Sequence, residues 1–152
     1  MGRIDAASRL IAATPEQVFA ALVDADALCS WLPPSGMNGR FEHFDARPGG
    51  SYRLILTYSD RSYGGKATDD SDIVEARFVD IVPNARVVQA IDFVSDDPGF
   101  AGTMTMTWDV VPVGESVRVE IRAANVPPGI SAEDHLVGLN SSLANLAAYI
   151  ER

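Results

Sequence analysis

The stretch ISAEDHLVGLNSSLANLAAYIER, residues 130–152, ends the chain and predicts its longest helix. Ser131 and Asp134 form a capping pair at its start, directly after the helix-breaking Pro127-Pro128-Gly129. Apolar residues recur along it at the spacing of one helix face, and they are Leu136, Leu139, Leu143, Leu146 and Ile150. No other stretch predicts a helix long enough to cover a sheet, so the fold depends on what this face contacts.

Asn140 interrupts this apolar face, one helical turn after Leu136 and about one turn before Leu143. A buried amide without a hydrogen-bond partner costs about 1–3 kcal/mol, so Asn140 needs a polar neighbour. One interpretation gives it a hydrogen bond to a Thr or Tyr of the sheet. The other places it on a cavity that holds water or a ligand, so that part of the helix lines a cavity rather than a solid core.

The stretch GTMTMTW, residues 102–108, has the clearest strand pattern, because apolar residues alternate with threonines. The segment SVRVEIRAA, which begins at Ser116, alternates in the same way between apolar and charged side chains. The apolar faces consist of Met104, Met106 and Trp108 in the first strand and Val117, Val119 and Ile121 in the second. Together with similar segments upstream, separated by turn sequences, they predict an antiparallel sheet with one wet and one covered face.

The start of the chain predicts one strand followed by two short helices. Residues 3–12 alternate as a half-buried strand does. Its apolar face consists of Ile4, Ala6, Leu10 and Ala12, opposite Arg3, Asp5 and Arg9. Thr14, Pro15 and Gln17 follow in the pattern of a capped helix start, and a second short helix, DADALCSWL, ends at Pro33-Pro34.

The order of these elements predicts an α+β fold within a single domain, residues 1–152. A curved antiparallel sheet of about six to seven strands wraps around the long C-terminal helix, and the two short helices close one end. Such a sheet is too wide for one helix to fill its concave face, so a pocket should remain between them.

Five segments, in this order, resemble the helix-grip fold of the START-like superfamily, also called SRPBCC. They are TPEQVFAALVDADALCSWL, RPGGSYRL, RVVQAIDF, GTMTMTWDVVP and LNSSLANLAAYI. The pattern is most similar to the bacterial branch related to activators of the heat-shock chaperone ATPase (AHSA-type), and it covers nearly the whole chain. The resemblance implies the fold but not the function, because members of the superfamily bind lipids, hormones or aromatic metabolites, cyclise polyketides, or bind proteins.

We expect the cavity wall to carry aromatic and methionine side chains, which form an adaptable apolar surface with a few polar groups. The candidate ligand-binding residues are Trp31, Tyr52, Tyr58, Phe93, Met104, Met106 and Asn140. Asn140 and the tyrosine hydroxyls would orient a polar group of the ligand. Trp31 could equally be a packing anchor, and Trp108 is interpreted as core.

The sequence predicts no metal site and no cofactor. His43, His135 and Cys29 have no recognised metal-ligand spacing, and no nucleophile or phosphate-loop motif is present. His135, at the cavity mouth, has two interpretations: a proton shuttle, or the favoured solvated or capping role. An enzyme would need a titratable group in the pocket, and the sequence places neither histidine nor Asp109 there.

The net charge of −9 argues against nucleic acid as a partner, because phosphate recognition needs a basic surface. No segment has the apolar length of a membrane span, and the N-terminus lacks the apolar run of a signal peptide. Cys29 is the only cysteine, so no intramolecular disulfide can form. We therefore expect a cytoplasmic protein, and the sequence leaves both a homodimer and a protein partner open.

The favoured function is the binding of a small, largely hydrophobic molecule, a lipid or an aromatic metabolite, between the sheet and the C-terminal helix. The first alternative is a polyketide cyclase- or dehydratase-like enzyme on the same scaffold, although the sequence leans against an enzyme. The second is a chaperone-associated protein-interaction module, which ranks last because the outward faces of the strands are charged or rich in threonine.

One substitution tests the cavity interpretation of Asn140. Asn140→Leu is expected to raise the free energy of unfolding, because it removes a buried amide, and to alter or abolish ligand binding. Denaturant unfolding and a binding measurement on the same variant check both effects. Unchanged binding together with equal or lower stability would count against a cavity role for Asn140.

Overall fold

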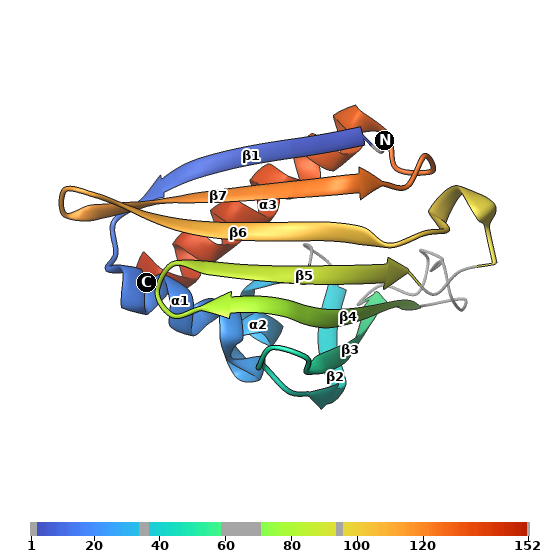
Figure 1. Ribbon diagram of the computed structural model, residues 1–152, viewed down its shortest axis with the longest axis horizontal. Coiled ribbons are helices and arrows are strands. Elements are labelled where there is room, and N and C mark those ends of the chain that lie inside the picture. The colour runs from blue at the N-terminus through green and yellow to red at the C-terminus, as the bar shows by residue number, and fades with distance from the viewer. Residues whose placement is uncertain (1–2, 34–36, 59–70, 94–95, 152) are drawn as a thin grey trace.

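The computed structural model describes residues 3–33, 37–58, 71–93 and 96–151, and its described strands form one antiparallel sheet (Figure 1). Across the sheet the seven strands follow the order β1-β7-β6-β5-β4-β3-β2. Their bounds are β1 Arg3–Ile11, β2 Met37–Phe44, β3 Ser51–Tyr58, β4 Ser71–Val82, β5 Arg86–Phe93, β6 Met104–Val113 and β7 Ser116–Val126. The expected curved sheet is confirmed.

Helices cover one face of this sheet. Helix α3 (Ala132–Glu151) crosses behind the strands in Figure 1, and α1 (Pro15–Val23) and α2 (Ala25–Trp31) lie at the end where β1 finishes. Their starts follow the sequence signals. The hydroxyl oxygen of Thr14 accepts a hydrogen bond from the Gln17 backbone N–H at 3.2 Å. Likewise the Ser131 hydroxyl oxygen accepts one from the Asp134 backbone N–H at 3.1 Å, so both predicted caps are confirmed.

Trp31 joins the short helices to the sheet. Its side chain is 2% exposed, and its indole N–H donates a hydrogen bond to the Ala21 carbonyl at 2.9 Å. Its ring meets that of Trp108 on β6 edge to face, with 5.6 Å between the ring centres. This arrangement fastens α2 to both α1 and the middle of the sheet, so Trp31 is a packing anchor as well as a candidate wall residue.

The face of β1 that points inward is the opposite of the predicted one. Ile4 and Leu10 are 61% and 58% exposed, whereas the Asp5 side chain is only 9% exposed. The register explains this, because Asp5 pairs with Ala123 and Ala7 pairs with Ile121, both of which are buried on the concave side of β7. Asp5 can lie there because Arg3 balances its charge and both Arg3 and His135 hydrogen-bond to its carboxylate, a possibility that apolar alternation cannot reveal.

The apolar face of α3 also differs from the prediction at its beginning. The buried residues are Leu139, Leu143, Leu146 and Ala147, whereas Leu136 is 46% exposed. Asn140 is exposed as well, and its side-chain amide donates a hydrogen bond to the Leu136 carbonyl of the same helix at 3.0 Å. The prediction that Asn140 belongs to the buried face is therefore wrong. The packed face runs through Leu139 and Leu143, which lie on either side of Asn140 in the sequence.

Gly129 brings the turn before α3 against the segment between β5 and β6. Its backbone N–H donates to the Gly99 carbonyl at 2.6 Å, and a Cβ atom on Gly129 would lie 2.6 Å from that same oxygen. Both atoms belong to the backbone, so neither can rotate away, and the start of α3 depends on a glycine here.

Gly129→Ala is expected to lower the free energy of unfolding by about 1–3 kcal/mol, because the added methyl group forces the two backbone segments apart. Gly138→Ala is the matched control, since a Cβ at Gly138 has no neighbour within 4 Å and lies inside α3. The control is expected to gain up to about 1 kcal/mol from helix propensity. Urea denaturation measures the free energies of unfolding of both variants. Equal stability of the two variants would contradict the close approach of Gly129 to the Gly99 carbonyl.

Candidate functional site

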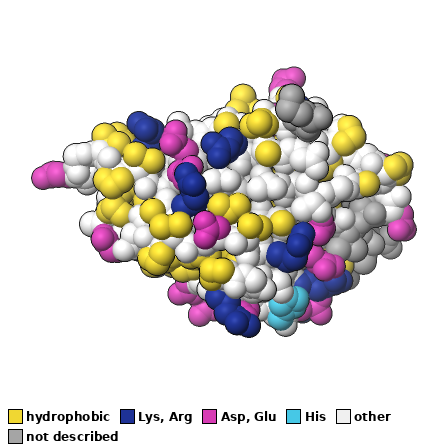
Figure 2. Space-filling view, in the orientation of Figure 1, with side chains coloured by type: hydrophobic (Ala, Val, Ile, Leu, Met, Phe, Trp, Pro, Cys, Tyr) yellow, Lys and Arg dark blue, Asp and Glu magenta, His cyan; other side chains and the backbone are white. Residues whose placement is uncertain are grey.

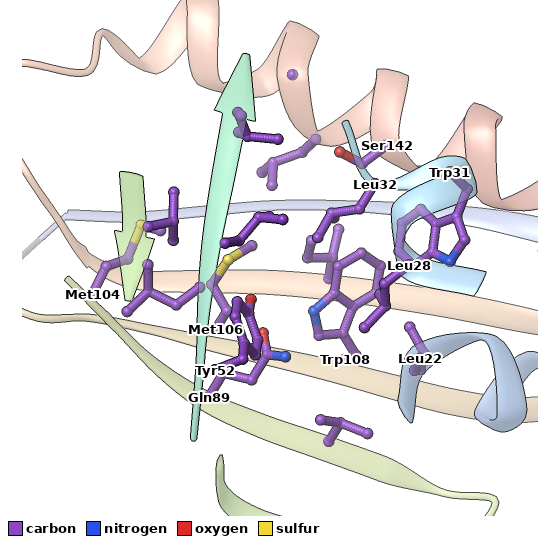
Figure 3. A pocket seen from close by; sticks show the side chains of 18 of the residues that line it. Leu22, Leu28, Trp31, Leu32, Tyr52, Gln89, Met104, Met106, Trp108 and Ser142 are labelled. Atoms are coloured by element: carbon purple, nitrogen blue, oxygen red, sulfur yellow. The ribbon is translucent and has the colours of Figure 1, made fainter. Parts of the chain in front are cut away.

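A cavity of about 310 Å³ lies between the concave face of the sheet and the first half of α3 (Figure 3). This volume is at the lower end of the range of about 300–1,000 Å³ that is typical of ligand pockets. Side chains of β3, β4, β5 and β6 form its floor, and α2 closes the end at Trp31. The cavity therefore occupies the part of the concave face that α3 leaves uncovered.

Five of the seven predicted residues lie on the cavity wall: Trp31, Tyr52, Phe93, Met104 and Met106. Figure 3 shows Trp31 toward one end and Met104 toward the other, with Met106 and Tyr52 between them. The side chain of Tyr58 lies outside the described residues. Asn140 is not among the lining residues, because it points to the exposed side of α3.

Other lining residues were not proposed from the sequence as ligand-binding residues. On α3 the wall is formed by His135, Gly138, Leu139 and Ser142. Trp108, interpreted as core, is 4% exposed and also borders the cavity. Gln89 lies between the apolar Val87 and Ile91 on the inward face of β5 and lines the cavity. A polar residue at an inward position of a strand is the sequence pattern that could have identified Gln89 as a cavity residue.

Tyr52 and Gln89 bring polar groups into the apolar wall. They are 4% and 6% exposed, and within the described residues neither the Tyr52 hydroxyl nor the Gln89 amide has a hydrogen-bond partner. Among the described residues, every side-chain N or O atom that is fully buried has a hydrogen-bond partner. The Tyr52 hydroxyl and the Gln89 amide have none, so they are not fully buried and reach the cavity space. Burial raises the pKa of Tyr52 far above its usual value, which keeps its hydroxyl protonated and able to donate.

His135 borders the cavity from α3 and is held by β1. Its Nδ1 atom lies 2.7 Å from Oδ2 of Asp5, and the two side chains are 12% and 9% exposed. Arg3 donates to Asp5 from Nε, at 3.2 Å to each carboxylate oxygen, and from Nη2 at 3.0 Å to Oδ2. Arg3 also donates to the Ile130 carbonyl, which ties this cluster to the turn before α3.

Asp5 stays ionised in this cluster. Burial alone would raise the pKa of its carboxyl, but hydrogen bonds from His135 and Arg3, and the positive charge of Arg3, together hold that pKa below its usual value. The described residues contain no group of three or more His, Cys, Asp or Glu that could hold a metal ion. The cluster is thus an ion pair with an oriented imidazole.

The family model for the activator of Hsp90 ATPase homolog 1-like protein matches residues 12–151, almost the entire chain. The chain belongs to this family. The predicted AHSA-type resemblance is thereby confirmed, together with the START-like, helix-grip fold. Comparison with curated proteins gives no match. In the described part of this AHSA1-type chain, no helix combines the length and the apolar content needed to cross a membrane.

Solved structures share the fold of this AHSA1-type chain along most of its length. Protein CV1439 from Chromobacterium violaceum is 30% identical, with 98% of this chain and 97% of that chain covered and a TM-score of 0.85. Protein Mll3558 from Rhizobium loti is 24% identical over 98% and 97% of the two chains, with a TM-score of 0.77. DynU16, from the dynemicin biosynthetic locus, is 17% identical, and the match covers 97% of this chain and 47% of that one, with a TM-score of 0.72. At these lower identities the similarity shows the fold alone.

Asp5→Asn is expected to lower the free energy of unfolding by about 1–3 kcal/mol near neutral pH, because it removes a charge that accepts hydrogen bonds from two side chains. A carboxyl whose pKa is lowered by folding stabilises above its unfolded pKa, at about pH 4, and loses this contribution as the pH falls through the folded value. The difference in the free energy of unfolding between the wild type and Asp5→Asn should therefore become smaller in acid. Urea denaturation across this range measures it, and a pH-independent difference would contradict the assignment.

Proposed function

We propose that the protein binds a small, largely hydrophobic molecule, a lipid or an aromatic metabolite, in the cavity between the sheet and α3. The observation that carries this proposal is the pair of polar groups on Tyr52 and Gln89, which have no hydrogen-bond partner in the part of the chain that the structure describes and lie inside a mostly apolar wall. In a solid core these groups would be destabilising, because an unsatisfied buried polar group costs about 1–3 kcal/mol. A bound molecule with an apolar body and one or two polar atoms would satisfy both.

The composition of the wall supports an apolar ligand body. Trp31, Trp108 and Phe93 offer rigid aromatic surface, and Met104 and Met106 offer flexible thioethers that adapt to the shape of a ligand. Each square ångström of apolar surface that a ligand buries contributes about 25 cal/mol. Because the cavity is small, we expect a compact molecule rather than a long-chain lipid with several acyl tails.

A cyclase- or dehydratase-like enzyme remains the second candidate, and one observation favours it. His135 lines the cavity and is oriented by Asp5, which is how an enzyme positions a general base. This alternative uses the same cavity and the same class of molecule, so it differs from simple binding only in whether the molecule is released unchanged.

Native mass spectrometry of the freshly purified protein tests the proposal directly. We expect a discrete added mass in the native spectrum that disappears on denaturation, and its formula would identify the molecule. The complementary measurement is titration with N-phenyl-1-naphthylamine, whose fluorescence rises in apolar surroundings. A bare native mass together with no fluorescence change would contradict a ligand-binding cavity.

Gly138→Leu provides a substitution test. Gly138 is an exposed residue of the cavity wall, and a Cβ there has no neighbour within 4 Å, so we expect a leucine side chain at this position to occupy ligand volume. Leucine is also a better helix former than glycine by up to about 1 kcal/mol, so the variant should be as stable as the wild type or more stable. We expect it to bind N-phenyl-1-naphthylamine at least about tenfold more weakly, a loss of about 1.4 kcal/mol.

Asn140→Leu is the matched control for this substitution. It adds the same side chain two residues further along α3, but at an exposed position outside the cavity. Because Asn140 lies outside the cavity, this variant is expected to bind like the wild type, contrary to the expectation from the sequence. Equal weakening by both substitutions would show that binding responds to the helix in general and not to the cavity.

A further inference from the structure

We infer that Asp5 and His135 form the polar anchor of the cavity, and that this anchor selects aromatic molecules with an ionisable hydroxyl, such as a phenol or an enol. His135 accepts the hydroxyl proton at Nε2, while Asp5 positions the imidazole. The inference rests on the proposed function and adds to it the chemical class of the ligand and the atom that recognises it.

The proton positions follow from the hydrogen bonds of Asp5. Its carboxylate already accepts hydrogen bonds from Nε and Nη2 of Arg3, so it is an ionised acceptor. The 2.7 Å contact between Oδ2 of Asp5 and Nδ1 of His135 must then be an N–H donation from the imidazole. In the neutral ring this leaves the lone pair on Nε2, the arrangement that an acidic side chain imposes on a histidine base.

Nε2 is free to meet a ligand. Within the described residues no hydrogen bond reaches it, and it is not sealed from water-sized space. His135 is one of the residues that line the cavity, and its side chain is 12% exposed. The one polar atom of the imidazole that the protein leaves unused therefore belongs to a residue of the cavity wall.

Stability alone does not explain this cluster. A buried ion pair is often no more stabilising than apolar side chains of the same size, because removing the charges from water offsets their attraction. Arg3 and Asp5 occupy inward positions on β1, opposite buried partners on β7 such as Ala123, where apolar residues would pack well. A contact with a polar ligand atom accounts for keeping charges at these positions.

An ionisable hydroxyl suits Nε2 better than a carboxylate does. The hydroxyl donates its hydrogen bond to the lone pair, and if the proton moves, the O–H bond breaks, an N–H bond forms at Nε2, and an oxyanion faces an imidazolium. Asp5 balances that imidazolium, and Arg3 balances Asp5. A carboxylate has no proton to give, so it would need the imidazole to take one from solvent first.

Charged side chains of β1 and α3 lie near His135. Arg3 and Asp5 face it from β1, and Glu133 and Asp134 precede it in the first turn of its own helix. The aromatic body of the ligand would contact the tryptophans and methionines of the wall, as the proposed function requires.

Two probes of the same shape test the inference, 7-hydroxycoumarin and coumarin, which lacks the hydroxyl. The wild type is expected to bind 7-hydroxycoumarin about tenfold more tightly than coumarin, as one hydrogen bond in a buried site allows. The bound probe should show the absorption band of its anion at a pH where the free probe is neutral.

Three variants separate anchoring from structural support. His135→Phe keeps an aromatic ring without nitrogen, and it should bind the two probes equally and show no anion band. Asp5→Asn should retain binding but lose most of the anion band, because the imidazole is no longer oriented. Asn140→Ala, on the exposed side of the same helix, should behave like the wild type. If His135→Phe fails to fold, His135→Gln replaces it, since an amide cannot take up the proton.

The outcomes distinguish this inference from the proposed function. Equal affinity of the wild type for both probes, with no anion band, overturns the inference while a ligand-binding cavity stands. An anion band that survives in the His135 variants also overturns it. If neither probe binds, the inference is wrong. Native mass spectrometry and the N-phenyl-1-naphthylamine titration then test independently whether the cavity binds any other ligand.

Discussion

The difference in width between the seven-stranded sheet and the single long helix that covers it determines the shape of this protein. Seven strands spaced about 4.8 Å apart span roughly 29 Å, whereas a helix with its side chains is about 10–12 Å wide. The single long helix, α3, can therefore seal only part of the concave face. Helices α1 and α2, fastened through Trp31, close one end, and the remaining space is the cavity. The cavity is a geometric consequence of the architecture rather than a local defect in packing.

Within that cavity, polar groups come from opposite sides for different reasons. Tyr52 and Gln89 project from the sheet and have no hydrogen-bond partner among the described residues, so their polar groups are available to a molecule in the cavity. His135 comes from the helix and is fixed by Asp5 on β1, and Arg3 continues the chain of contacts to the turn before α3. The same cluster that attaches α3 to the edge of the sheet thus presents an oriented nitrogen to the cavity. The atoms that attach α3 to the edge strand are therefore also those through which we propose that a ligand is recognised.

Membership of the AHSA1-type family fixes the scaffold but leaves the chemistry to individual side chains. The similarity to structures such as CV1439 of Chromobacterium violaceum extends along nearly the whole chain. On the face seen in Figure 2, acidic and basic side chains lie next to one another among hydrophobic ones. On the strands, Arg53 makes ion pairs with Glu42 and Glu75. The polar groups that support the proposed recognition lie inside the cavity.

The sequence by itself determined the elements whose signals are local. The caps at Thr14 and Ser131 and the alternation through Met104, Met106 and Trp108 depend on neighbours within a few residues, and such local signals predicted the helices and the strands. Five of the seven residues predicted to bind a ligand also lie on the cavity wall. Tertiary structure decided the rest. Asn140 turned out to be exposed because the packed face of α3 runs through Leu139 and Leu143. On the covered face of β1, Asp5 forms an ion pair with Arg3 and a hydrogen bond with His135, which is distant in the sequence. Apolar periodicity assigns every charged residue of a strand to its exposed face. Asp5 can be buried because the folded chain brings Arg3 and His135 to its carboxylate, and His135 is too distant in the sequence for a local pattern to reveal this.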